Sequence, residues 1–231
     1  MIYSDKAARY RERTAALLGE EAMRRLKDSF VAVVGLGGVG GSCAEALARS
    51  GVGRLLLIDG DIVDETNLNR QAAAAESTLG MKKTEALSLR LRDVSQAELT
   101  LVSEFVNADN AEGLIPPEVD FVVDAVDDME AKIALARLIV SRETLFVACM
   151  GAGRRLDPSG FRVMDVMKTT NCPLARRYRR ELRAAGIAHV PVVASDETPI
   201  DTGGQLGSFA PAVNAAGLVA AAFVIRTLCG R

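Results

Sequence analysis

Short apolar runs alternate along the chain with longer segments of helical spacing. Runs over residues 30–35, 54–59 and 145–150 predict buried strands, and residues 99–104 and 119–127 predict two more. Helical patterns cover residues 14–28, 42–51, 76–94 and 129–143. Repeated strand–helix–strand order needs crossover connections. The pattern therefore predicts an α/β fold, a Rossmann-like and mostly parallel sheet with helices on both faces.

The character of the chain changes after Gly151. Two short strands, one over residues 161–166 and one within 190–199, are expected to be antiparallel, and residues 173–185 predict an Arg-rich helix. An apolar run over residues 215–225, preceded by Pro211, predicts a buried core helix. A membrane anchor is the alternative, although a span needs about 20 apolar residues.

The length and composition favour one ordinary globular domain. The chain has 231 residues, of which 49% are hydrophobic and 25% charged. We expect one domain over residues 1–231, with a nucleotide-binding core at 9–150 and an extension at 151–231 that faces the substrate. The polar N-terminus contains no apolar signal core. Four widely spaced cysteines form no C-x-x-C, which predicts no zinc site and indicates a reducing, cytoplasmic location.

A glycine-rich segment follows the first strand and opens the next helix. Gly35, Gly37, Gly38 and Gly40 satisfy the pattern G-x-G-x-x-G. Such glycines allow a tight turn and close approach of backbone N–H groups to a phosphate, at the positive end of a helix. Asp59 ends the second strand, where an acid can accept hydrogen bonds from a ribose. This context predicts a nucleotide site without deciding which nucleotide binds.

The segment 59–71, DGDIVDETNLNRQ, contains more polar chemistry than a dinucleotide site needs. Arg70 and a lysine, either Lys82 or Lys83, could neutralise charge on a phosphoryl group. Either Asp124 or Asp127, at the end of the fourth strand, could hold a metal ion. Because the carboxyl ends of parallel strands share one sheet edge, these residues should converge there. The set favours phosphoryl or nucleotidyl transfer over hydride transfer.

The motifs GLGGVGG, LIDGDIVDETNLNRQ, GMKKTEA and VDAVDD resemble the ThiF/MoeB/HesA family, which includes ubiquitin-activating enzymes and adenylates carboxylates with Mg-ATP. The resemblance covers residues 9–150. It implies ATP and Mg²⁺ as cofactors and a homodimer in which an N-terminal arginine enters the partner's site. Arg13 is the nearest match, before Arg9 and Arg11. The resemblance implies that Asp59 holds the ribose and that Asp127 positions Mg²⁺. It implies phosphate contacts for Asn67, Arg70 and Lys83, and Asp61 is a further predicted nucleotide contact.

Two features depart from the sulfur-carrier activators of this family. Paired C-x-x-C motifs are missing, and Cys172 is the one cysteine in the region of their catalytic cysteine. Residues 150–187 and 190–200 resemble a different branch, the tRNA threonylcarbamoyladenosine dehydratases. That resemblance implies adenylation of the threonine carboxylate of a modified adenosine beside the anticodon, followed by ring closure that expels AMP. An intramolecular nucleophile needs neither zinc nor an enzyme thiol.

The charge distribution agrees with an RNA substrate. Residues 154–183 contain nine Lys and Arg and three Asp and Glu, a local net charge of +6 in a chain of net charge −2. A basic patch on an acidic body suits phosphate contacts. An Arg-rich solvated helix is the simpler alternative. The predicted tRNA contacts are the following: Arg154, Arg155, Lys168, Arg176, Arg177, Arg179 and Arg180.

Two other functions stay open at this point. The first is activation of the C-terminus of a sulfur-carrier protein, with a sulfur-relay protein as a further partner. The second is a non-catalytic NAD(P)-binding module, against which Arg70 argues. His189 is the one histidine and has no neighbouring nucleophile motif, so a hydrolase triad is not supported. Tyr178 is expected to be a partly buried aromatic rather than a stacking platform for a base.

Overall fold

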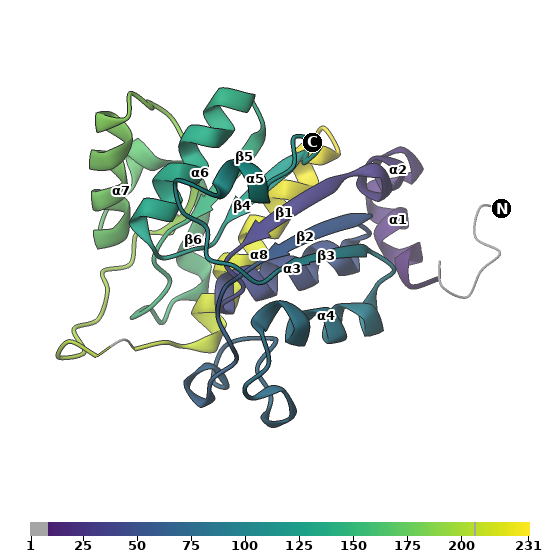
Figure 1. Cartoon of the computed structure of the whole chain (residues 1–231), viewed down its shortest axis with the longest axis horizontal. Coiled ribbons are helices and arrows are strands. Elements are labelled where there is room, and N and C mark those ends of the chain that lie inside the picture. The colour runs from purple at the N-terminus through teal and green to yellow at the C-terminus, as the bar shows by residue number, and fades with distance from the viewer. Residues whose placement is uncertain (1–8, 206) are drawn as a thin grey trace.

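The computed structural model describes residues 9–205 and 207–231, so residues 1–8 of the expected domain lie outside it. A seven-stranded sheet with the order β3-β2-β1-β4-β5-β7-β6 forms its centre (Figure 1). The strands have these bounds: β1 Phe30–Val34, β2 Arg54–Ile58, β3 Glu98–Val102, β4 Phe121–Asp124, β5 Leu145–Cys149, β6 Phe161–Asp165 and β7 Pro191–Ser195. Every pairing is parallel except that of β6 with β7.

Helices cover both faces of the sheet, as the sequence pattern predicted. Apolar residues of α2, α3, α4 and α8 pack on one face, and those of α5, α6 and α7 pack on the other. The central strands β1 and β4 are buried on both sides, which explains their continuous apolar sequences. The helices have these bounds: α1 Glu12–Leu18, α2 Glu20–Asp28, α3 Gly38–Ser50, α4 Lys83–Val94, α5 Ala111–Leu114, α6 Met129–Arg142, α7 Pro173–Ala184 and α8 Ala210–Leu228.

The C-terminal helix α8 packs directly on α3, the helix that follows the glycine loop. A side chain at Gly217 would overlap the carbonyl of Val39, and one at Gly38 would overlap Val213. Ser42 donates to Asn214 across the same contact at 2.9 Å. By length and composition α8 could cross a membrane, which is weak evidence because core helices pass the same test. Its inner face lies in the core, as the interpretation of a core helix requires.

Two expected helices are shorter than predicted. The helix expected over residues 14–28 is divided at Gly19, whose φ of +84° ends α1 before α2 begins. The helix expected over residues 76–94 begins only at Lys83, after a turn in which Gly80 has a φ of +78°. Glycine adopts such angles without steric cost, and each therefore acts as a boundary. The extension after Gly151 joins the same sheet through β7 and β6.

Candidate active site

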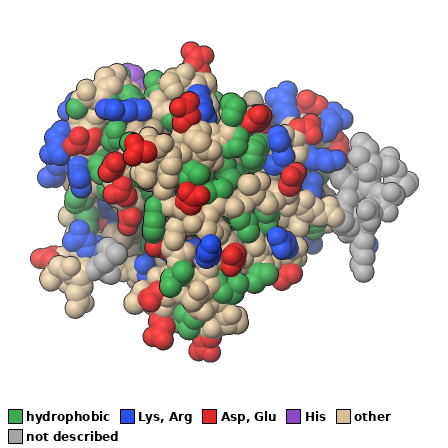
Figure 2. Space-filling model, viewed as in Figure 1, with side chains coloured by type: hydrophobic (Ala, Val, Ile, Leu, Met, Phe, Trp, Pro, Cys, Tyr) green, Lys and Arg blue, Asp and Glu red, His purple; other side chains and the backbone are tan. Residues whose placement is uncertain are grey.

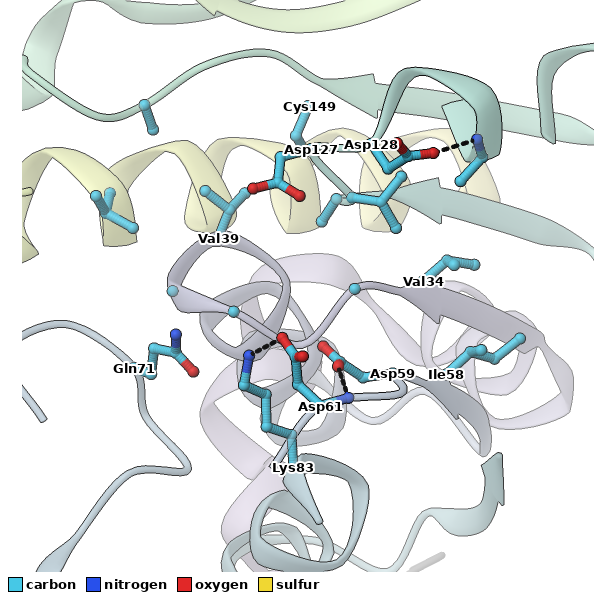
Figure 3. A pocket seen from close by; sticks show the side chains of 18 of the residues that line it. Val34, Val39, Ile58, Asp59, Asp61, Gln71, Lys83, Asp127, Asp128 and Cys149 are labelled. Carbon is cyan, nitrogen blue, oxygen red and sulfur yellow. Dashed lines mark hydrogen bonds and ion pairs between the residues drawn. The ribbon is translucent and has the colours of Figure 1, made fainter. Parts of the chain in front are cut away.

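A pocket of about 610 Å³ opens where β2, β1, β4 and β5 end side by side. Figure 3 shows Asp59, Asp61 and Lys83 on one side of it and Asp127 and Cys149 on the other. The residues predicted for the nucleotide that line the pocket are the following: Gly35, Gly37, Gly38, Asp59, Asp61, Asn67, Arg70, Lys83 and Asp127. Strand ends thus bring together residues that lie up to 92 positions apart.

The four glycines of the loop have separate tasks. Gly35 has a φ of +85°, and a Cβ there would lie 2.8 Å from the carbonyl carbon and oxygen of Ala125. A Cβ at Gly40 would overlap the carbonyl oxygen of Gly35, and Gly38 packs on α8. At Gly37 the nearest neighbour of a Cβ would be Gln71 Nε2 at 4.0 Å, so this backbone remains open to a ligand. Gly40 supports the loop from the first turn of α3 without lining the pocket.

Asp59 holds the turn after β2. Its Oδ2 accepts from the backbone N–H of Leu36 at 2.6 Å, and its Oδ1 accepts from the N–H of Asp61 at 2.8 Å. One carboxylate therefore joins the turn to the glycine loop of β1. Each oxygen retains a lone pair, so the carboxylate can still accept from a ribose hydroxyl in the pocket.

Lys83 and Asp61 form an ion pair on the same side of the pocket. The Nζ–Oδ2 distance is 2.7 Å, and the side chains are 7% and 52% exposed. Lys83 is the first residue of α4, and its N–H donates to the carbonyl of Asp61 at 3.0 Å. Of the two lysines left open by the sequence, Lys83 enters the pocket, whereas Lys82 is exposed as the N-cap of α4.

The segment with Asn67, Arg70 and Gln71 forms the third wall. Asn67 is buried and accepts from the N–H of Asp64 at 3.2 Å. Arg70 Nη1 donates to the carbonyl of Thr66 and to Asn69 Oδ1, both at 2.9 Å. Gln71 is buried, and its Oε1 has no hydrogen-bond partner in the described part of the chain. A buried amide oxygen without a partner is costly, so a bound ligand or solvent molecule is expected to supply a donor.

The structure decides between the two aspartates at the end of β4. Asp124 is fully buried, and its carboxylate accepts from Lys132 Nζ at 2.9 Å and from the N–H of Val126 at 3.1 Å. Burial raises the pKa of this carboxyl, and the Lys132 ammonium opposes that shift. Asp127 is exposed at the pocket (Figure 3), and Asp128 caps α6 by accepting from the N–H of Ala131 at 2.8 Å. Of the aspartates that follow β4, Asp127 is therefore the one whose carboxylate is available to a ligand.

Several pocket residues were not predicted from the sequence, and Phe105, Glu104 and Gln71 are examples. Phe105, which is exposed, packs against Gly60, and a Cβ at that glycine would come within 2.5 Å of its ring. Glu104 lies beside it. Both residues follow β3, and this position after the end of a strand is the only feature of the sequence that could have predicted them as pocket residues. Gln71 stood in the quoted motif, but no pattern around it predicted a role for its side chain.

The basic patch differs from the expectation at two positions. Arg155 is 1% exposed, and its guanidinium donates to the carbonyls of Gly151 (3.0 Å), Asn171 (3.5 Å) and Glu197. Such a group cannot contact RNA phosphates, and its prediction as a tRNA contact is corrected for that reason. Arg179 is half-buried and donates to the carbonyl of Thr169 at 2.9 Å.

The other predicted basic residues lie at or near the surface. Lys168, Arg176, Arg177 and Arg180 are exposed, and Arg154 is half-buried. Basic side chains gather along the edge formed by α7 (Figures 1 and 2). Tyr178, between these arginines in sequence, faces inward and is fully buried, so it is no platform for a base.

The remaining predicted residues lie outside the pocket of the described chain. Arg13 is exposed on α1, at the opposite edge of the sheet (Figure 1). Arg11, near it, lies 3.4 Å from where a Cβ of Gly51 would be, at the end of α3 far from the glycine loop. Cys172 is buried as the N-cap of α7, and its Sγ accepts from the N–H of Ala175 at 3.4 Å.

The chain belongs to the ThiF family, whose model matches residues 10–231. It is 41% identical over 190 residues to the tRNA threonylcarbamoyladenosine dehydratase of Bacillus subtilis (strain 168), covering 81% of this chain and 75% of that protein. The structure of E. coli tRNA N6-threonylcarbamoyladenosine dehydratase, TcdA, in complex with ATP superposes with a TM-score of 0.93. It is 33% identical and covers 100% of this chain and 98% of that one.

The chain is also similar, over a smaller part of its length, to an adenylyltransferase and sulfurtransferase. The adenylyltransferase and sulfurtransferase MOCS3 of Drosophila willistoni is 36% identical over 136 residues, covering 58% of this chain and 30% of that protein. The dehydratase similarity therefore covers more of this chain, and that structural match includes the extension after Gly151. This is the part of the sequence in which the dehydratase resemblance was expected.

Proposed function

We propose that this chain is an ATP-dependent tRNA threonylcarbamoyladenosine dehydratase. The observation that carries the proposal is the pocket at the carboxyl edge of the sheet, where an open glycine loop, the carboxylates of Asp59 and Asp127 and the cations Arg70 and Lys83 line one cavity. The dehydratase relatives support the choice of substrate, and the relative solved with ATP supports the choice of nucleotide.

In the proposed reaction, an oxygen of the substrate's threonine carboxylate attacks the α-phosphorus of ATP. The bond from that phosphorus to the bridging oxygen breaks, and pyrophosphate leaves. A nitrogen or the oxygen of the neighbouring carbamoyl group then attacks the acyl carbon, and the bond from that carbon to AMP breaks. A carbamoyl N–H loses its proton to solvent in either case, and AMP leaves. The substrate loses the elements of one water. Ring closure within one molecule has a high effective concentration, so adenylation is the step that needs the enzyme most.

The pocket residues are assigned to the first step. Arg70 and Lys83 would stabilise negative charge on the phosphates in the transition state, and Asp59 would fix the ribose. Asn67, buried beside them, would donate to a phosphate oxygen. For Lys83 this requires that a phosphate compete with the Asp61 carboxylate, which accepts a hydrogen bond from Lys83 Nζ at 2.7 Å.

The residues present fit Mg²⁺. The described residues contain no group of three or more His, Cys, Asp and Glu side chains that could hold a metal ion alone. Mg²⁺ commonly binds through one or two carboxylates together with substrate phosphates and waters, and Asp127 offers such a carboxylate at the pocket. When bound, the ion would neutralise charge on the phosphates. Asp124 is unsuited because its carboxylate already pairs with Lys132.

We further propose a homodimer that completes the site. Arg13 is exposed on α1 and does not line the pocket of its own chain, which fits a residue that acts on the partner's nucleotide. The outward face of α8, with Leu218 54% exposed, offers apolar area for such a contact. The proposed location of the enzyme is the cytoplasm, where its tRNA substrate is made.

We assign tRNA binding to the exposed arginines of α7 with Lys168 and Arg154. The alternative function, activation of a sulfur-carrier protein, is favoured by the MOCS3 similarity and by the presence of Cys172. A thioester route requires that thiol, so Cys172→Ser tests it directly. Serine preserves the N-cap of α7, and full activity would exclude the thioester. A sulfur-relay protein stays a proposed partner only.

The experiment that tests the function is mass analysis of nucleosides after incubation with Mg-ATP. Modified tRNA should yield a threonylcarbamoyladenosine product lighter by one water, and only when ATP is present. An unchanged nucleoside together with pyrophosphate exchange driven by a small carrier protein would favour the alternative. Binding of NAD without any ATP turnover would favour the non-catalytic module.

A further inference from the structure

The pocket extends beyond the part that the nucleotide residues occupy. Along the sheet edge, Asp59 follows β2, the glycine loop follows β1, Asp127 follows β4, and residues 150–153 follow β5. Neighbouring strands lie about 4.8 Å apart, so β5 ends roughly 14 Å from β2. The end of the pocket at β5 therefore lies across the phosphate loop from the ribose acid. Its walls are Met150–Gly153, Leu174 and Ser208.

One buried guanidinium holds this end of the pocket together. Arg155 donates to the carbonyl of Gly151 in the wall, to that of Asn171 just before α7, and to that of Glu197. In return, the Glu197 carboxylate accepts from the N–H of Leu156 at 2.9 Å and from that of Asp157 at 3.1 Å. Three loops from distant parts of the sequence are thus fixed to one side chain.

The neighbouring residue fixes the remaining wall. The N–H of Arg154 donates to the carbonyl of Gly207 at 2.9 Å, and the N–H of Ile200 donates to the carbonyl of Arg154 at 2.8 Å. Asn69 Nδ2 donates to Ser208 Oγ at 3.0 Å, which connects this wall to the segment with Arg70. These hydrogen bonds connect the wall to the phosphate side of the pocket.

The electrostatics of this end favour an anion. Among the described residues, no carboxylate lies within 4.0 Å of the Arg155 guanidinium, whose hydrogen bonds all go to backbone carbonyls. A buried cation whose direct partners are all neutral carbonyls contributes a positive potential to an adjacent cavity. The carboxylates of the pocket follow β2, β3 and β4 rather than β5, and they are Asp59, Asp61, Glu104, Asp127 and Asp128.

The same end connects directly to the basic surface. Leu174, in the first turn of α7, lines the pocket, and Arg176 and Arg177 are exposed two and three positions later. An RNA bound along α7 would therefore present an extruded nucleotide to the β5 end. Enzymes that modify a base commonly take it out of its stack in this way.

We propose that the β5 end of the pocket is the acceptor subsite, which receives the carboxylate-bearing side chain of the modified adenosine, and that Arg155 is the positioning residue that holds its walls. This inference rests on the proposed function. It adds the location of the second reactant, on the side of the phosphate loop opposite the ribose acid.

The test compares three variants and three ligands. Leu174→Phe narrows the subsite from a half-buried position, and Arg155→Lys keeps the charge but cannot reach three carbonyls. Binding of the free threonylcarbamoyladenosine nucleoside and the KM for modified tRNA are measured beside the Kd for ATP. Both variants should weaken nucleoside and tRNA at least about ten-fold, or about 1.4 kcal/mol, and change the Kd for ATP less than about two-fold. Arg176→Ala should weaken tRNA alone.

Leu89→Phe and Arg92→Lys on the exposed face of α4 are the matched controls. Unchanged nucleoside binding in Leu174→Phe would overturn the subsite, as would a parallel loss of ATP affinity. If Arg155→Lys does not fold, Leu174→Phe alone decides. A wild-type protein that binds ATP but never acts on modified tRNA would overturn the proposed function instead, so the two failures are distinguishable.

Discussion

The ammonium of Lys83 lies 2.7 Å from the carboxylate of Asp61, and the lysine side chain is almost completely buried. The pair joins the start of α4 to the turn after β2 and holds a cation at the side of the pocket (Figure 3). A desolvated ammonium is a strong partner for a phosphate that replaces the aspartate. We therefore interpret the pair as a preorganised phosphate contact.

Replacing Lys83 tests this interpretation. Lys83→Met should lower kcat/KM for ATP by about 10²- to 10³-fold, because removal of one charge-stabilising group typically has that effect. Asp61→Asn should have a smaller effect, since the ammonium remains. Steady-state AMP release gives both values. A Lys83→Met protein with wild-type kcat/KM would show that the lysine serves only the fold.

Asp127 has a matched neighbour for comparison. Asp127→Asn should reduce AMP formation by about 10²-fold or more while ATP binding and the melting temperature change little. Asp128→Asn should keep normal activity, because asparagine caps a helix as well as aspartate does. Activity measured over a range of Mg²⁺ concentrations should show a higher Mg²⁺ requirement for Asp127→Asn alone. Equal requirements in the two variants would refute the metal assignment.

The buried cluster of Asp124, Lys132 and Tyr178 leads to a prediction about stability. Lys132 pairs with Asp124, and its Nζ lies 5.6 Å from the centre of the Tyr178 ring. The Tyr178 hydroxyl is buried without a hydrogen-bond partner in the described part of the chain. Tyr178→Phe should therefore leave the free energy of unfolding unchanged or raise it by about 1 kcal/mol. Asp124→Leu should lower it by about 3–5 kcal/mol, because Lys132 would remain buried and unpaired. Urea denaturation measures both changes.

Cys149 borders the pocket but is not suited to be a nucleophile. Burial raises the pKa of its thiol from 9.0 to about 12. Below pH 9 the thiol is protonated in the native and unfolded states alike. Between pH 9 and 12 only the unfolded state loses the proton, so the thiol's contribution to stability falls as pH rises. The melting temperatures of wild type and Cys149→Ala, measured from pH 8 to 11, should therefore converge. A constant difference would contradict this.

The exposed arginines of α7 predict a salt effect. The slope of log K against log salt is negative, and each phosphate contact removed reduces its magnitude by about 0.7 to 0.9. Arg176→Ala with Arg177→Ala should weaken binding of modified and unmodified tRNA alike and reduce the slope by about 1 to 2. Arg162, which already pairs with Asp196, should matter less when replaced. A slope unchanged in the double variant would place the RNA elsewhere.

The central sheet and its nucleotide edge could be predicted because local patterns determine them. Apolar runs marked β1, β2, β4 and β5 to within a few residues, and the position of each polar residue after a strand placed it at one edge. The end of α1 and the start of α4 were missed because a glycine with positive φ interrupts a helix pattern that hydrophobic spacing would continue. The sequence shows the glycine but not its φ.

Side-chain direction set the limit of prediction at the site. Asp124 and Asp127 were equivalent in sequence, and only the tertiary contact with Lys132 separates them. Arg155 added one positive charge to a count of the basic patch, yet it points inward to three carbonyls. Charge composition identifies a basic region, but it does not show which of its cations are buried and bonded within the protein. The acceptor subsite was invisible for the same reason.

The most direct measurement is release of AMP and pyrophosphate from Mg-ATP with threonylcarbamoyladenosine-bearing tRNA, with unmodified tRNA and without tRNA. The account predicts release of one AMP and one pyrophosphate per modified tRNA converted, and none in the other two reactions. Release at the same rate with unmodified tRNA, or none with any tRNA while ATP is bound, would contradict it.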